Sequence, residues 1–182
     1  MTVTRHIPRG PRCAAPAVWG RCLFACTLLA FLGSSRLEAA PAVGEEAPDF
    51  ALKTFVDGNV RLSEFRGEVV VLNFWAAWCG PCQQELPRLN DLFQRYQRAG
   101  LVMLGVNLDD DIGRAQDMSR RLGLAFPMLF DPAKAVGRLY ELDALPVTVF
   151  IDREGVVRHV HETFRVEDGA VYLEQIRQLL DE

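Results

Sequence analysis

Cys79 and Cys82 are the residues of this sequence whose type and spacing most directly suggest chemistry. They lie between an apolar run, Val69–Ala76, and a segment with apolar residues at helical spacing. This pattern predicts Cys79 at a helix N-terminus, where unpaired N–H groups and the helix dipole favour an anion such as a thiolate. Thiols placed in this way have pKa values lowered from about 8.5 to roughly 3.5–7.5. We therefore expect Cys79 to attack a partner disulfide, and the more buried Cys82 to resolve the mixed disulfide.

Two other interpretations of this cysteine pair are open. A structural disulfide over so short a loop would stabilise little. A metal site would need a second pair of ligands, which the sequence does not supply at the usual spacing. The remaining cysteines, Cys13, Cys22 and Cys26, all fall in the first forty residues, so the body of the chain keeps only the one pair.

Gly80 and Pro81, between the cysteines, indicate the direction of electron flow. Neither residue supplies a cation that would stabilise the thiolate and make the pair more oxidising. The reduction potential should therefore lie nearer the thioredoxin value of about −270 mV than the strongly oxidising value of about −120 mV. This favours a reductant.

The elements that must position these residues alternate between strands and helices. We expect strands at 69–76, 101–108, 128–130, 147–152 and 156–161, and helices at 83–99, 112–122, 133–142 and 167–180. Pro87 predicts a kink in the first helix and Gly100 its end, while Val171, Ile176, Leu179 and Leu180 form the apolar face of the last. The order predicts an α/β domain with a mixed central sheet flanked by helices on both faces.

Residues 1–40 read as a targeting segment, separate from the domain at 41–182. Arginines precede the apolar run Cys22–Gly33, and small residues follow it, which is typical of a cleaved secretory signal. A short uncleaved membrane anchor and a lipid-modified Cys26 are the alternatives. Each predicts a periplasmic or other extracytoplasmic body, either soluble after cleavage or tethered.

Charge excludes one class of partner. The first forty residues carry a net charge of +4 and the remaining 142 a net charge of −8, with no basic run. A body of this charge is a poor match for a polyanion, so we expect no nucleic-acid binding.

Five stretches together carry a family resemblance. They are Leu72–Cys82 (LNFWAAWCGPC), Gly44–Leu52, Leu62–Gly67, Cys82–Pro87 and Leu145–Asp152. They resemble the exported TlpA/ResA-type members of the thioredoxin family over about residues 44–182, including a strand–helix segment around 101–130 that plain thioredoxins lack. The resemblance implies a thioredoxin-like fold and a thiol-disulfide oxidoreductase, which we expect to be a monomer.

The same resemblance implies roles for residues around the cysteines. Pro146 matches a cis-proline beside the disulfide, which would turn the Leu145 backbone outward to pair with a bound peptide; a trans proline opening a strand is the alternative. Asn73 occupies the place of a buried aspartate that accepts protons in many thioredoxins. Since an amide cannot do so, Glu85 is the nearest replacement as general base, unless it is an ordinary solvated helix residue.

Three further features are interpreted more simply. Trp78 either shields the disulfide and contacts partners, together with Gly80 and Pro81, or merely packs. His159 and His161 lie on one strand face, which we expect to be exposed, because no third ligand accompanies them. Asp109–Asp111 reads as a strand exit and helix cap. We expect no metal site.

The leading functional hypothesis is an exported reductant of cysteine pairs. The resemblance implies apocytochromes c or copper-site proteins as substrates, and a membrane-embedded thiol transporter as electron donor. We expect no cofactor beyond the Cys79–Cys82 disulfide, since no nicotinamide or flavin fingerprint is present. The alternatives are a disulfide oxidase or isomerase, a copper chaperone, and a peroxidase. The residue at position 76 argues against a peroxidase, because it is alanine here, whereas peroxiredoxins carry threonine at this place.

Overall fold

The computed structural model describes residues 42–182. The predicted signal or anchor at 1–40 therefore lies outside the described residues. Within residues 42–182, no helix is both long enough and apolar enough to cross a membrane.

Seven strands and four helices make up this part of the chain. The strands are β1 (Ala51–Thr54), β2 (Asn59–Arg61), β3 (Val69–Trp75), β4 (Leu101–Asn107), β5 (Met128–Phe130), β6 (Val147–Ile151) and β7 (Val157–His161). The helices are α1 (Gly80–Tyr96), α2 (Ile112–Leu122), α3 (Ala135–Leu139) and α4 (Asp168–Asp181), with 3₁₀ turns at Leu62–Phe65 and Gln97–Ala99. All five predicted strands and four predicted helices are present; β1 and β2, which are short and partly exposed, were not predicted.

Two helices differ from the prediction for identifiable reasons. α1 begins at Gly80 rather than at residue 83, because the Cys79 sulfur caps it and Pro81 fits its first turn. α3 is shorter than the predicted 133–142, because the Asp131 carboxylate accepts from the backbone N–H groups of residues 135, 136 and 137 and so sets its start. Gly100, with φ of 97°, closes the segment after α1 as predicted.

The strands form one mixed sheet in the order β2-β1-β5-β4-β3-β6-β7. β3 pairs in parallel with β4 and antiparallel with β6, and all seven of its residues are buried. β3 is therefore the centre of the sheet, and its C-terminal end carries the cysteine motif.

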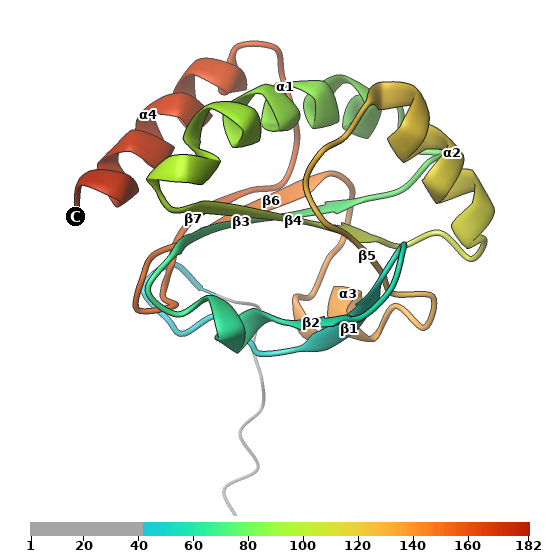
Figure 1. Ribbon diagram of the computed structural model, residues 1–182, viewed down its shortest axis with the longest axis horizontal. Coiled ribbons are helices and arrows are strands. Elements are labelled where there is room, and N and C mark those ends of the chain that lie inside the picture. The colour runs from blue at the N-terminus through green and yellow to red at the C-terminus, as the bar shows by residue number, and fades with distance from the viewer. Residues whose placement is uncertain (1–41) are drawn as a thin grey trace, which may run out of the picture. The chain divides into compact units, whose positions relative to one another are not determined.

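Helices cover both faces of the sheet, as predicted. In Figure 1, α1, α2 and α4 lie over one face, and the short α3 lies on the other. Side chains alternate along β3: Val71 and Trp75 pack in the core under α1 and α4, whereas Leu72 and Phe74 pack in the core that includes α3. The result is a thioredoxin-like arrangement in layers.

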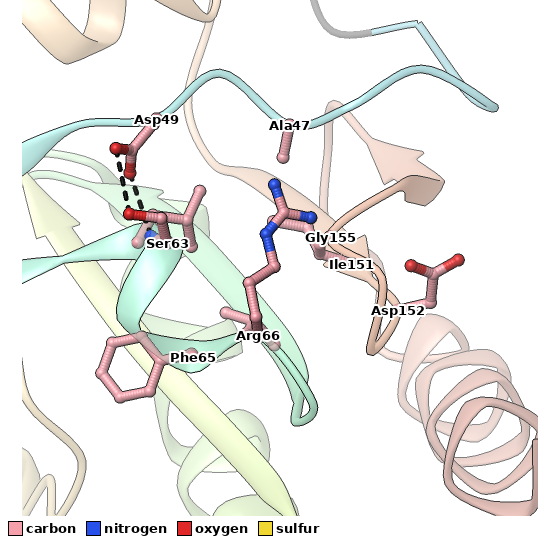
Figure 2. A pocket seen from close by; sticks show the side chains of 10 residues that line it. Ala47, Asp49, Ser63, Phe65, Arg66, Ile151, Asp152 and Gly155 are labelled. Carbon is pink, nitrogen blue, oxygen red and sulfur yellow. Dashed lines mark hydrogen bonds between the residues drawn. The ribbon is translucent and has the colours of Figure 1, made fainter.

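A small pocket lies at the opposite end of the sheet from the cysteines (Figure 2). Arg66 reaches across it to the Glu154 carbonyl and the Glu46 carboxylate, while Asp49 accepts from the Ser63 backbone N–H at 2.9 Å. The pocket borders Val70, near the start of β3. Since a strand rises about 3.3 Å per residue, Val70 is about 17 Å from Trp75, at the end of β3 that leads to the cysteines. The two contacts of Arg66 join the segment before β1, at Glu46, to the turn between β6 and β7, at Glu154. The pocket is separate from the cysteine site.

Candidate active site

Cys79 and Cys82 lie where the central strand meets the first helix. Cys79 is the N-cap of α1, and its sulfur accepts a hydrogen bond from the Cys82 backbone N–H at 3.2 Å. The two sulfurs form a disulfide, with the Cα atoms 5.3 Å apart. The predicted position of Cys79 at a helix N-terminus is confirmed, and the N–H that reaches its sulfur would stabilise a thiolate after reduction.

The side chains around the disulfide divide into exposed and buried groups. Trp78 is 70% exposed, and Gly80 and Pro81 are also exposed. Cys79 is 4% exposed and Cys82 is fully buried, which is the order expected for an attacking and a resolving thiol. An indole with this exposure does not serve core packing, so that alternative for Trp78 is wrong.

The loop that carries Trp78 and Cys79 is held from two sides. The Asp109 carboxylate, just after β4, accepts from the Ala77 backbone N–H and from the Asn107 side chain, each at 2.7 Å. On the helix side, Gln83 donates to the Ala77 carbonyl at 3.2 Å.

The sequence predicts Asp109 only as part of a strand exit, so its contact with Ala77 was not expected. The neighbouring Asp111 caps α2 as predicted, since its carboxylate accepts from the Gly113 backbone N–H. The sequence signal for Asp109 is its position directly after a buried parallel strand beside β3.

Glu85 is fully buried on the side of α1 that faces the sheet. The alternative of a solvated helix glutamate is therefore wrong. Glu85 follows Cys82 by three positions, and side chains at this spacing are neighbours on a helix, with Cβ atoms about 5–6 Å apart. The carboxyl group is thus placed one turn behind the resolving cysteine.

Three donors from three different elements surround the Glu85 carboxylate. The Asn73 side chain donates to Oε2, and the hydroxyls of Thr148 and Tyr172 donate to Oε1, each at 2.8 Å. Asn73 also donates to the Thr148 oxygen at 2.8 Å. The orientation of this carboxyl group is therefore fixed jointly by β3, β6 and α4, which carry Asn73, Thr148 and Tyr172.

Thr148 and Tyr172 were missed by the sequence analysis. Thr148 is the one polar residue of β6, and a hydroxyl in an otherwise apolar buried strand is a usable signal. Ile176 and Leu179 of the predicted apolar face are buried, but in the first turns of the helix the buried residue is Tyr172 rather than the predicted Val171, which is 44% exposed.

Burial raises the pKa of Glu85 above its ordinary value, and the nearby Asp168 carboxylate adds to the rise. The hydrogen bonds from Tyr172, Thr148 and Asn73 oppose it without cancelling it. The pKa of Glu85 therefore moves toward that of a thiol, as proton exchange with a cysteine requires. Burial and the charge of Glu85 also raise the pKa of Tyr172, so its hydroxyl stays protonated and remains a donor.

The Leu145–Pro146 bond is cis, as the resemblance implied. Val147 pairs with Phe74, so Pro146 lies at the same end of the sheet as Cys79. Pro146 is buried and Leu145 is half-buried between the two cores. The structure thus brings this turn and the cysteine motif to one edge of the molecule.

The two histidines of β7 are not on an exposed face, contrary to expectation. His161 packs against the Tyr172 ring at 4.9 Å, and its Nε2 lies 2.9 Å from the Gln175 side-chain oxygen. His159 packs against Phe150. The expectation was wrong because α4 covers this end of β7. No group of three or more potential metal ligands occurs among residues 42–182.

Comparison with known proteins gives a consistent picture. The model of the AhpC/TSA family matches residues 43–160. The thiol-disulfide oxidoreductase ResA of Geobacillus thermodenitrificans is 38% identical over 141 residues, covering 77% of this chain and 81% of that protein. ResA of Oceanobacillus iheyensis is 33% identical over 144 residues, covering 77% and 72%.

Solved structures of thiol-disulfide exchange proteins are also similar to this chain. A structure described as the thiol:disulfide interchange protein DsbE from Chlorobium tepidum is 38% identical, with a TM-score of 0.74 over 78% of this chain and 99% of that one. A secreted thiol-disulfide isomerase from Corynebacterium glutamicum is 27% identical, with a TM-score of 0.69 over 74% and 85%.

Proposed function

Because this chain belongs to the AhpC/TSA family and is a ResA-like thiol-disulfide oxidoreductase, we propose that it works as a reductant of partner proteins outside the cytoplasm. The observation that carries the proposal is the Cys79 sulfur, which caps α1 and accepts from the Cys82 N–H with only Gly80 and Pro81 between them. This arrangement favours a thiolate at Cys79 without a side-chain cation that would make the pair strongly oxidising.

The exchange takes place in two substitutions at sulfur. The Cys79 thiolate attacks one sulfur of the partner disulfide; a mixed disulfide forms, and the other partner sulfur leaves as a thiolate. Cys82 then gives its proton to Glu85 and attacks the Cys79 sulfur, which releases the second partner thiolate. The products are an oxidised Cys79–Cys82 pair and a reduced partner, so two electrons have moved to the partner.

The exposed side chains at the motif form the proposed substrate surface. Trp78, Gly80 and Pro81 face solvent beside the disulfide, and the turn at Leu145–Pro146 lies at the same sheet edge. An extended peptide carrying a disulfide can pair with the backbone at Leu145 while Trp78 contacts its side chains. No metal or organic cofactor enters this scheme.

The proposed substrates are cysteine pairs of apocytochromes c or of copper-site proteins. The proposed electron donor is a membrane-embedded thiol transporter, which would return the Cys79–Cys82 pair to the dithiol form. Support for an extracytoplasmic location comes from the sequence pattern at 1–40 and from the relative that is described as secreted.

A disulfide oxidase or isomerase is the second candidate, because one structural relative is described as an isomerase. A peroxidase has less support, since buried Ala76 offers no hydroxyl where peroxiredoxins carry threonine. Copper binding by the reduced pair is tested by titrating copper into the reduced protein and, for comparison, into a Cys82→Ser variant. Stoichiometric binding that depends on Cys82, without disulfide-reductase activity, would favour a copper chaperone.

The deciding measurement is the reduction potential of the Cys79–Cys82 pair, equilibrated against glutathione and dithiothreitol buffers. We expect a value near or below about −250 mV, which would make the pair a reductant. A value of about −120 to −180 mV would assign the protein to the oxidases or isomerases and overturn the proposed direction.

A further inference from the structure

Tyr172 connects the last helix to the chemistry of the cysteine pair. Its side chain is fully buried, and its hydroxyl lies 2.8 Å from Glu85 Oε1. The ring packs against Phe150 at 5.3 Å and His161 at 4.9 Å between centroids. These two rings also pack against each other, and the close packing leaves the Tyr172 ring little freedom, so the direction in which the hydroxyl donates is set by the fold.

The hydrogen bonds on the carboxylate are distributed unequally. Oε1 receives two donors, Thr148 and Tyr172, whereas Oε2 receives only Asn73. Each carboxylate oxygen has two acceptor sites, so Oε1 is saturated and Oε2 keeps one free. The free site is the one available to a proton.

Asn73 can respond when that proton arrives. Its side-chain oxygen is buried and has no hydrogen-bond partner among the described residues. Rotation of the amide would present this oxygen to a protonated Glu85 as an acceptor, with loss of the hydrogen bond that Asn73 donates to Thr148. The cluster therefore holds an acceptor for a proton on Oε2, provided that the carboxyl group itself does not turn.

We propose that Tyr172 is a positioning residue for disulfide exchange: its hydroxyl keeps Glu85 Oε1 occupied, so that Oε2 exchanges the proton with Cys82. In this step the Cys82 S–H bond breaks, an O–H bond forms on Oε2, and the sulfur keeps the electron pair with which it attacks Cys79. The inference rests on the proposed role of Glu85 as base.

The other ionisable groups that face Glu85 are few. Asp168 acts on it from α4, and the two cysteines lie at the N-cap and in the first turn of α1; Asn73 and Thr148 do not ionise. His161 lies against the Tyr172 ring rather than against the carboxylate. A change in the pH dependence of the Cys82 step after loss of the Tyr172 hydroxyl can thus be assigned to Glu85.

The Cys82 step is measured with one equivalent of 5,5′-dithiobis(2-nitrobenzoate). Attack by Cys79 on this aromatic disulfide releases a first coloured thiolate, and attack by Cys82 on the mixed disulfide releases a second. The pH profile of the second phase is recorded for the unsubstituted protein, Tyr172→Phe, Glu85→Gln and the double variant. Tyr140→Phe is the matched control, because Tyr140 is also buried but donates to the Pro48 carbonyl in the other core.

We expect Tyr172→Phe to move the midpoint of this profile upward by about one pH unit, which is the size expected for one hydrogen bond to a charged group. In the Glu85→Gln background the same substitution should produce no further shift, and Tyr140→Phe should leave the midpoint unchanged. An unshifted Tyr172→Phe profile, or an equal shift in both backgrounds, would overturn the inference.

Failure of the underlying proposal gives a different result. If Glu85→Gln alone leaves the second phase and its pH profile unchanged, Glu85 is not the base, and the inference falls with that role. If Tyr172→Phe does not fold, the Tyr172 hydroxyl proton is followed by NMR in the unsubstituted protein across the Glu85 titration. A resonance that does not move with that titration would also overturn the inference.

Discussion

The two sulfur atoms of the motif have different surroundings, although they are bonded to each other. Cys79 lies at the helix terminus beside exposed Trp78 and Gly80, and its sulfur accepts a backbone N–H. Cys82 is fully buried, one turn ahead of Glu85. The first sulfur is therefore placed to form an anion near solvent, and the second to react only inside the protein.

This difference predicts unequal trapping of partner proteins. Cys82→Ser should accumulate mixed disulfides through Cys79, because the resolving thiol is missing, whereas Cys79→Ser should accumulate none. Non-reducing gels of cells that express each variant measure the outcome. Equal trapping by the two variants would contradict the assigned roles.

At the scale of elements, the active-site loop depends on β4 as well as on β3 and α1. The Asp109 carboxylate holds the Ala77 N–H, and Asn107 in turn holds Asp109. Asp109 is 3% exposed, so loss of the carboxylate would leave a partly buried N–H without a partner.

Asp109→Ala should therefore lower the free energy of unfolding by about 1–3 kcal/mol and slow the reaction of Cys79 with a small disulfide. Urea unfolding and stopped-flow rates measure the two effects. Asp110→Ala is the control: Asp110 is an exposed neighbour whose ion pair with Lys134 should contribute less than about 1 kcal/mol. Equal effects of the two substitutions would show that the contact with Ala77 does not hold the loop.

Elements with strong periodicity were predictable, and contacts between elements were not. The apolar runs of β3, β4 and β6 and the motif at Cys79 locate the site from sequence, because strand, turn and helix signals follow one another there. The environment of Glu85 could not be predicted, since Asn73, Thr148 and Tyr172 meet only after β3, β6 and α4 pack. The choice of Val171 rather than its neighbour Tyr172 for the apolar face of α4 was enough to hide Tyr172.

At the scale of the whole molecule, two carboxyl groups affect stability with opposite dependence on pH. Burial raises the pKa of Glu85, so its contribution is favourable below the unfolded value near 4.5 and is lost as the pH rises through the folded pKa. For Asp49, burial alone would raise the pKa, but hydrogen bonds from Ser63 and Arg61 lower it overall. Its contribution is present above the unfolded value and is lost as the pH falls.

Glu85→Gln should therefore gain stability relative to the unsubstituted protein as the pH rises from 4 to 8, by about 1.4 kcal/mol for each unit of raised pKa. Asp49→Asn should be less stable than the unsubstituted protein by a nearly constant amount over this range, because the charge it removes is favourable throughout; the difference should shrink only as the pH falls below the ordinary pKa of 3.8. Free energies of unfolding in urea at several pH values from 2 to 8, measured on oxidised protein, test both trends. Differences that stay constant with pH for both variants would contradict the prediction.

The hydrogen bond between Tyr172 and Glu85 joins residues 87 positions apart. During synthesis, the strand, the cysteine motif and the helix that carries Glu85 leave the ribosome long before Tyr172 does. Until α4 docks, the Glu85 carboxyl lacks one of its donors and part of its cover from water. A nascent chain thus holds the Cys79–Cys82 pair but not yet the environment that controls it, and the redox chemistry of the pair matures only when the last helix has folded.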